Sequence, residues 1–168
     1  MTGRGEESGM ISEQASKLLV AQIGHEFTAH QLYMGISLYF ERESLKGWSK
    51  LFHDQAVEEA GHGGKIMAFL IDNEVDFALP AVRGAPTTYP SARAAVETAL
   101  ASEQKVTALF ETMVNTCRDA QDNRSLQFLW WFVEEQVEEE RTARALLDLI
   151  DSGINLFQAE SMLDGITG

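Results

Sequence analysis

Apolar residues recur at steps of three and four along four long segments of the chain, at about residues 12–43, 45–72, 91–119 and 122–153. This spacing is typical of one buried face of an α-helix, and we find no alternation of the kind that β-strands show. The three prolines all lie in the stretch 78–91, so proline interrupts none of these segments. The pattern therefore predicts an all-α protein built on four long helices.

Residues with known preferences for helix ends mark the boundaries of these segments. Ser12 and Ser91 can each accept a hydrogen bond from the first turn of a helix, and Asp122 or Asn123 can do the same for the fourth. Gly153 suits the position just after a helix. The amphipathic stretch 154–163 that follows predicts a short fifth helix, within a tail that we place at residues 154–165.

The lengths of the connections predict how the helices are arranged. Short links join the first helix to the second and the third to the fourth, so each pair should form an antiparallel hairpin. The link between the second and third helices has roughly fifteen residues, enough to run the height of the bundle, and such a crossover marks one subclass of four-helix bundles. We therefore expect a single domain over residues 1–168, with residues 1–10 as a flexible N-terminus.

The apolar stripe of each helix is interrupted near its middle by an acidic side chain. Because antiparallel helices of similar length bring their midpoints to one level, these side chains should meet inside the bundle. On the second helix a histidine follows the glutamate at the i+3 position, on the same face. The residues expected to converge are Glu26, Glu59, His62, Glu103 and Glu139, with Glu140 as the alternative on the fourth helix.

This cluster of acids favours bound cations. Buried carboxylates without partners cost several kcal/mol each, and no Lys or Arg occupies the stripes at that level. Glutamates from separate helices, combined with a Glu-x-x-His element such as Glu59 to His62, form the di-iron carboxylate pattern. The alternative is that the stripes are misphased, so that the acids lie on a solvated face of a metal-free structural bundle.

Composition and charge narrow the possible partners. The formal net charge of −13 argues against nucleic acids and anionic membranes and is compatible with cations, although acidity often serves solubility alone. Cys117 is the only cysteine, which excludes an intrachain disulfide and cysteine-based metal clusters. The polar N-terminal residues and the lack of a long apolar run predict a cytoplasmic protein.

Together, these motifs resemble the non-haem bacterial ferritins over about residues 11–163. The sequences that carry the resemblance are HEFTAHQLY, VEEAGH, ASEQ and WWFVEEQVEEE, which contain the predicted acids. The resemblance implies a ferritin-like bundle that assembles into a shell of 24 subunits. Such a shell oxidises Fe²⁺ with O₂ or peroxide and stores ferric mineral inside.

The resemblance also implies a role for each matching residue. One iron ion would lie between Glu26, Glu59 and His62. Glu59 would bridge to a second ion held by Glu103 and Glu139, with Gln136 nearby.

A third iron site is implied at Glu58, Glu135 and Glu138, with Glu139 able to bridge to it. Tyr33 matches a tyrosine beside the iron pair that can supply an electron. Trp131 matches an aromatic residue near the site, where simple core packing is an equally good interpretation.

Two departures from related families refine this hypothesis. Bacterioferritins have a haem-ligating methionine where this chain has Ala60, so we expect no haem. They also have a second Glu-x-x-His element, where this chain has Gln136 and Glu139, which favours a weakly held, exchanging second iron.

Other interpretations stay open at this point. One is a di-iron oxidase or peroxidase that works without a cage, and another is the metal-free bundle. Asp119 and Asp122 could line an iron channel, or Asp122 could simply cap a helix.

Overall fold

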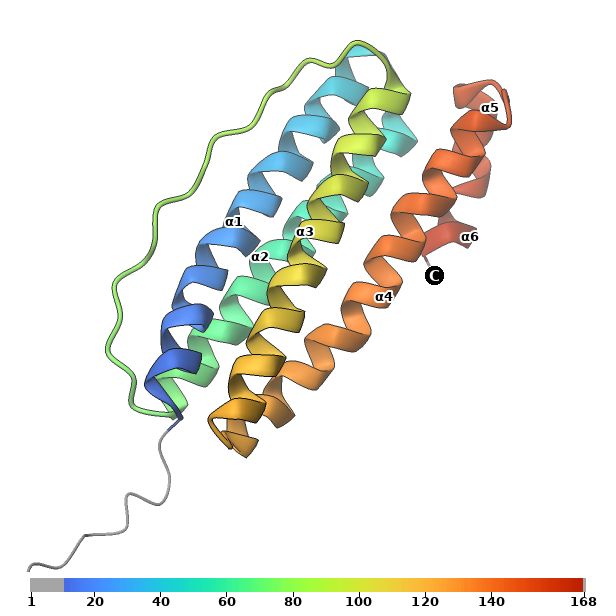
Figure 1. Cartoon of the computed structure of the whole chain (residues 1–168). Coiled ribbons are helices and arrows are strands. Elements are labelled where there is room, and N and C mark those ends of the chain that lie inside the picture. Colours follow the sequence, from blue (N-terminus) through green and yellow to red (C-terminus); the bar gives the residue numbers. More distant parts are fainter. Residues whose placement is uncertain (1–10, 168) are drawn as a thin grey trace, which may run out of the picture.

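The computed structural model describes residues 11–167, so the N-terminus predicted to be flexible lies outside the described residues. Four long helices follow one another as α1 (Glu13–Arg42), α2 (Lys46–Asp72), α3 (Ala92–Asp119) and α4 (Asn123–Asp151) (Figure 1). Within residues 11–167 there is no strand. The predicted all-α, four-helix fold is confirmed, and the helix boundaries agree with those expected from the sequence. None of the helices in this range is both long and apolar enough to cross a membrane.

Side chains cap three of the four long helices at their N-termini. Ser12 accepts a hydrogen bond from Ala15 N, Ser91 from Ala94 N, and Asp122 from Ser125 N. Asp122 also accepts from Ser12 N at 2.8 Å, so its carboxylate joins the start of α1 to the start of α4. Asp122 is buried, and these contacts favour its interpretation as a cap over a role in lining a channel.

The crossover, residues 73–91, runs along α1 for the height of the bundle (Figure 1). As a result α3 begins at the end of the bundle opposite to where α2 finishes, as the length of the link predicted. Two glycines of α1 make the close approach possible. A Cβ atom on Gly24 would lie 3.0 Å from Pro80 Cγ, and one on Gly35 would lie 2.2 Å from the carbonyl oxygen of Pro86.

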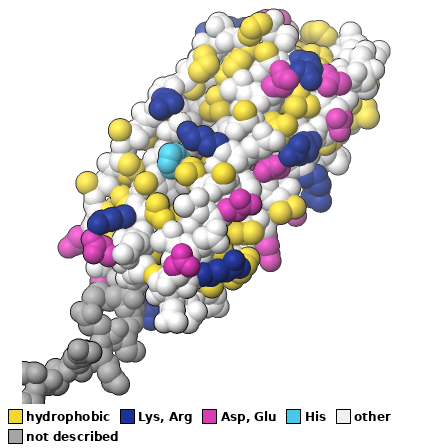
Figure 2. Space-filling view, in the orientation of Figure 1, with side chains coloured by type: hydrophobic (Ala, Val, Ile, Leu, Met, Phe, Trp, Pro, Cys, Tyr) yellow, Lys and Arg dark blue, Asp and Glu magenta, His cyan; other side chains and the backbone are white. Residues whose placement is uncertain are grey.

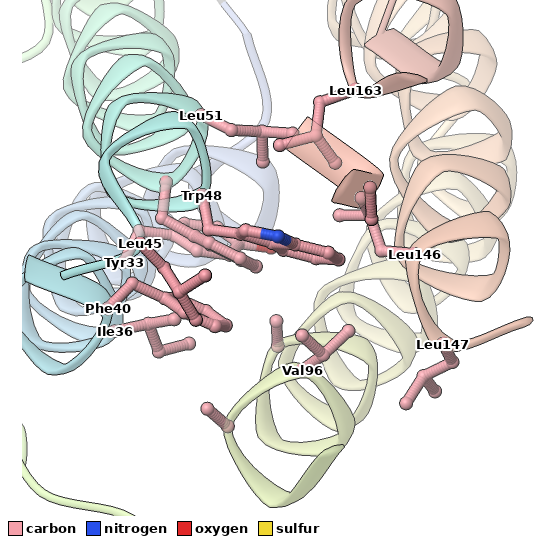
Figure 3. Packing of buried hydrophobic residues seen from close by; sticks show 14 of the residues in the cluster. Tyr33, Ile36, Phe40, Leu45, Trp48, Leu51, Val96, Leu146, Leu147 and Leu163 are labelled. Atoms are coloured by element: carbon pink, nitrogen blue, oxygen red, sulfur yellow. The ribbon is translucent and has the colours of Figure 1, made fainter. Parts of the chain in front are cut away.

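The apolar core is divided into two clusters by a polar layer. One cluster fills the end of the bundle that holds the N-terminus of α1, and includes Leu19, Ile66, Phe110 and Leu129. The other fills the opposite end, where Trp48 lies among side chains of all four helices and the C-terminal segment (Figure 3). Between them, every helix contributes buried polar groups. We call this set the acidic layer: Glu26, Glu59, His62, Glu103, Gln136 and Glu139.

The C-terminal segment is less regular than the single fifth helix expected over residues 154–163. It consists of three short turns, α5 (Leu156–Ala159), the 3₁₀ turn η1 (Glu160–Met162) and α6 (Asp164–Thr167). The Trp48 indole donates a hydrogen bond to the carbonyl of Leu156 at 3.0 Å, and Leu163 is buried and points toward Leu51 (Figure 3). A segment this short has little helical stability of its own, so its course is decided by such contacts.

Candidate metal centre

The five residues expected to converge do lie together between the two apolar clusters. The exposed fractions are 1% for Glu26, 2% for Glu59, 5% for His62, 1% for Glu103 and 5% for Glu139. Each of the four long helices supplies one of these carboxylates. Glu140, the alternative to Glu139, belongs to none of the candidate metal-binding groups. It accepts a hydrogen bond from Thr107 and pairs with Arg144.

Ligand atoms in and beside the acidic layer form three groups. In each group, all the ligand atoms lie within 4.8 Å of one another. The first group is Glu26, Glu59 and His62, and the second is Glu59, Glu103 and Glu139. Glu59 belongs to both, so one carboxylate lies where two neighbouring cations would share it. The third group is Glu58, His62, Glu135 and Glu139.

The first group contains a buried oxygen that lacks a hydrogen-bond partner. Glu26 Oε2 is unsatisfied, whereas Glu26 Oε1 accepts a hydrogen bond from Gln22 Nε2 at 2.8 Å. His62 Nδ1 lies 3.7 Å from Glu26 Oε2 and 3.4 Å from Glu59 Oε2. An unpaired buried carboxylate oxygen is costly, and a cation bound beside it would remove that cost. The residues present therefore fit a metal ion.

Glu103, in the second group, is oriented by hydrogen bonds from neighbouring helices. The hydroxyl of Tyr33 on α1 donates to Glu103 Oε1, and Gln136 Nε2 on α4 donates to Glu103 Oε2 at 3.1 Å. Gln136 Nε2 also lies 3.3 Å from Thr107 Oγ1. In this arrangement Tyr33 and Gln136 act as donors that hold both oxygens of Glu103 in place. The carboxylate so oriented still lies within 4.8 Å of ligand atoms of Glu59 and Glu139.

The electrostatics of the acidic layer favour a bound cation. Burial raises the pKa of Glu59 well above its usual value, and nearby carboxylates add to this effect. Burial followed by the charges of Glu103 and Glu58 raises the pKa of Glu139 to about 8. Burial opposes the charged form of His62, but its contacts with Glu26 and Glu59 outweigh burial and raise the pKa of the imidazole to about 11. Without a cation the layer thus holds protons, which a metal ion must displace.

The third group lies at the border between the acidic layer and the surface. Glu58 is exposed and Glu135 is half-buried, whereas the other two members are buried. The structure brings Glu58 and Glu135 together, but it does not bring Glu138 within ligand distance of them. The exposed carboxylate of Glu138 lies 3.8 Å from the Arg141 guanidinium instead.

Trp131, on α4, lies beside His62, on α2. The two rings meet edge to face with centroids 5.5 Å apart, and the ammonium group of Lys65 lies 3.5 Å from the centroid of the indole ring. The indole is 36% exposed, so it covers the His62 side of the acidic layer without being part of the closed core. This placement is compatible with both packing and a redox role.

The remaining histidines and the cysteine have structural settings. His30 Nδ1 forms a hydrogen bond with the carbonyl of Ala56 at 2.7 Å, and His30 belongs to none of the three groups of ligand atoms. His53 is exposed, and Cys117 is buried in the core.

Two residues that support the site were missed in the sequence. Gln22 is 1% exposed and donates to Glu26 from one helical turn earlier, while Thr107 lies one turn after Glu103 and contacts Gln136. Their i−4 and i+4 spacing from the predicted acids is a signal that could have identified them.

The chain is similar to known proteins over most of its length. Residues 16–152 match the family described as ferritin-like domain. The chain is 32% identical over 157 residues to Ferritin BfrB of Mycolicibacterium smegmatis, covering 93% of this chain and 87% of that protein. It is also 32% identical over 149 residues to a bacterial non-heme ferritin of Bacteroides fragilis, covering 86% of this chain and 94% of the relative.

The solved structure of an open pore ferritin from Archaeoglobus fulgidus has the same fold, with a TM-score of 0.87 and 29% sequence identity. The similarity covers 94% of this chain and 98% of that one. The family match and the extent of the relatives lead to one conclusion: this chain belongs to the ferritin family.

Proposed function

We propose that this protein stores iron, oxidising Fe²⁺ in the acidic layer of each subunit and keeping the ferric product inside a shell of 24 copies. The observation that carries the proposal is the pair of buried ligand groups joined through Glu59. Glu26, Glu59 and His62 would hold one ion, and Glu59, Glu103 and Glu139 the other. Carboxylates combined with a single imidazole suit iron in both oxidation states.

A pair of iron ions is suited to two-electron chemistry. Each Fe²⁺ gives up one electron, so two of them reduce O₂ together with two protons to hydrogen peroxide. With hydrogen peroxide as the oxidant, the same two electrons and two protons give two molecules of water. Tyr33 is buried beside Glu103 and donates a hydrogen bond to it, so it would hold this ligand in place during either reaction.

The third group supports a route by which iron leaves the acidic layer. His62 and Glu139 belong both to this group and to the buried groups, so an ion can move outward while keeping some of its ligands. Glu58 lies at the exposed side of the group. Having Gln136 and Glu139 in place of a second Glu-x-x-His element supports a weakly held second ion. The two iron ions would thus be bound only temporarily. After oxidation they would leave past Glu58 and Glu135, and then past Glu138.

The oxidation of iron can be tested by stopped-flow absorbance of the ferric product after Fe²⁺ is mixed with aerobic protein. Glu59→Gln should lose the fast phase because both ligand groups are incomplete without this carboxylate. Glu134→Gln is a matched control, since Glu134 is an exposed acid on α4 that belongs to none of the three groups. Equal rates in wild type and Glu59→Gln would refute the site.

The shell is tested separately by analytical ultracentrifugation. A particle near twenty-four times the subunit mass of 18.6 kDa supports storage. A stable dimer with intact iron oxidation would indicate a cage-independent oxidase instead. The visible spectrum of the purified protein tests the expectation, based on Ala60, that no haem is bound.

A further inference from the structure

A pocket of about 490 Å³ lies between α1, α3 and the crossover. Its floor is α1, one wall is the crossover segment 80–83, and the other wall is formed by Lys105 of α3. We call it the crossover pocket. The α1 residues that line it are Ala21, Gly24, His25 and Thr28.

The backbone sets the shape of this pocket. Gly24 allows Pro80 to lie directly on α1, because a Cβ atom there would come within 3.0 Å of Pro80 Cγ. One turn further on, Arg83 N donates a hydrogen bond to Thr28 Oγ1 at 3.2 Å. Arg83 is therefore held at the rim by its own main chain, and the pocket exists without a ligand to organise it.

The titratable groups that line the pocket are all basic: His25, Arg83 and Lys105. The space-filling view shows a histidine close to Lys and Arg side chains on the face formed by the crossover, α1 and α3 (Figure 2). Burial, and then the charges of Lys105 and Arg83, lower the pKa of His25. Two permanent positive charges thus act on one small volume.

Arg83 and Lys105 differ from the other basic side chains in residues 11–167. Lys17, Lys46, Lys50, Arg93, Arg141 and Arg144 pair with carboxylates. Arg42 and Arg124 donate to polar oxygens, and Lys65 and Arg118 lie over indole rings. Within the described residues, the side chains of Arg83 and Lys105 have no such contact.

It is unexpected from the composition that two basic side chains without a partner lie close together. The chain has 26 acidic and 13 basic residues, so a basic side chain placed at random should find a carboxylate easily. Among the described residues six basic side chains do pair with a carboxylate and four make the other contacts named above. The two that make neither kind of contact, Arg83 and Lys105, lie in the same pocket, where no acidic residue lines the wall. Like charges repel, and a small anion between them would remove that cost.

We propose that the crossover pocket binds a small oxyanion of the phosphate class. The guanidinium of Arg83 presents paired N–H groups that match two phosphate oxygens, and Lys105 adds a point charge from the opposite wall. The Thr28 hydroxyl, whose oxygen already accepts from Arg83 N, can donate its own proton to the anion. A dianion balances the two permanent charges. The bound anion would also tie the crossover to α3.

Isothermal titration calorimetry with inorganic phosphate tests this site on the metal-free, fully assembled protein at low ionic strength. Wild type should show saturable binding of about one phosphate per chain. The double substitution Arg83→Gln with Lys105→Gln should weaken binding by about tenfold for each charge removed. Both side chains are exposed, so the fold should be retained, and circular dichroism checks this.

The matched control is Lys17→Gln with Lys50→Gln. It removes the same amount of positive charge from two exposed lysines that already pair with Glu13 and Asp54. The control should bind phosphate as wild type does. Thr28→Val should weaken binding without changing the net charge, because it releases the main chain of Arg83 and removes a donor.

Competition separates a shaped site from general attraction to positive charge. Sulfate, a tetrahedral dianion, should compete with phosphate, whereas chloride at equal ionic strength should not. Three results would overturn the proposal: no saturable binding to wild type, equal loss in the pocket variant and the lysine control, or competition by chloride as strong as by sulfate.

Discussion

The hydroxyl of Tyr33 donates a hydrogen bond to Glu103 and so joins α1 to α3 in the middle of the acidic layer. Burial, and then the charge of Glu103, raise the pKa of Tyr33 well above its usual value, so the hydroxyl keeps its proton and remains a donor. Burial raises the pKa of Glu103. The hydrogen bonds from Tyr33 and Gln136 lower it, and so favour the charged carboxylate. The contact links the packing of the bundle to the ionisation of a proposed ligand.

Replacing Tyr33 by Phe should destabilise the metal-free protein by about 1–3 kcal/mol, because it leaves a buried carboxylate oxygen without its donor. Urea denaturation of wild type and variant at one protein concentration measures the difference. Tyr39→Phe is the control: the Tyr39 ring packs on Phe40 and Tyr89, and its hydroxyl has no hydrogen bond within the described residues. That change should cost less than about 0.5 kcal/mol. Equal effects of the two substitutions would contradict the role given to the hydroxyl.

The stability of the metal-free protein should depend on pH through Glu139. Its pKa is about 8 in the folded protein and usually 4.5, so folding takes up a proton between these two pH values. The free energy of unfolding should therefore fall as pH rises through this window, by an amount on the order of a few kcal/mol. Glutamine resembles the protonated acid at every pH. In Glu139→Gln the free energy of unfolding should therefore fall less as pH rises.

Chelator-treated wild type and Glu139→Gln can be compared by urea denaturation at about pH 5 and about pH 8. The variant should gain stability relative to wild type as pH rises. Parallel pH profiles would show that Glu139 does not hold its proton in the folded state. Adding a divalent cation at the higher pH should stabilise wild type more than the variant, because the cation replaces the proton.

Gly35→Ala should destabilise the protein, because the added Cβ atom would lie 2.2 Å from the carbonyl oxygen of Pro86. The crossover would have to move away from α1, at a cost of roughly 1–3 kcal/mol. Gly64→Ala is a control with the opposite sign. Gly64 is inside α2 with nothing within 4 Å of the added atom, so alanine should stabilise by about 0.5–1 kcal/mol. Thermal or urea denaturation compares the two, and the same sign for both would refute the steric account.

Glu160 caps α2 from the far end of the chain. The N-cap residue Leu45 provides no side-chain hydrogen bond, and Glu160 Oε1 accepts one from Gly47 N at 2.8 Å instead. Glu160→Ala should cost about 0.5–2 kcal/mol, as other lost caps do, whereas Glu160→Gln keeps an acceptor oxygen and should cost less. Asp164→Ala removes an exposed acid from the same segment and should be close to neutral. An alanine variant at Glu160 that matches wild type would show that this contact does not stabilise α2.

Most of the fold could be predicted because helix signals are local. Ser12, Ser91 and Asp122 cap the helices at which they were expected, since capping depends on the two or three residues that follow. That the link between α2 and α3 can run the height of the bundle also followed from its length alone. Its close contact did not, because Gly24 and Gly35 carry no apolar signal, and their role is visible only once Pro80 and Pro86 lie against them.

The candidate site divides in a similar way. Its acids were identifiable because each interrupts an apolar stripe, and helical periodicity alone identifies such a position as buried. Which atoms lie within reach of one ion depends on how each helix is rotated about its axis. The rotation of the helices places Glu135 and His62, and not Glu138, within ligand distance of Glu58, and the sequence alone could not show this.

The sequence by itself determined which residues are helical and which acids interrupt the apolar stripes, with Glu139 or Glu140 left open on the fourth helix. Both follow from the spacing of residues at most four positions apart. Only the tertiary structure decided that Glu139, and not Glu140, joins Glu59 and Glu103, that the C-terminal segment breaks into short turns around Trp48, and that Arg83 and Lys105 meet in one pocket. Each of these joins segments that are distant along the chain. Their relative positions depend on how whole helix faces pack, which no local pattern encodes.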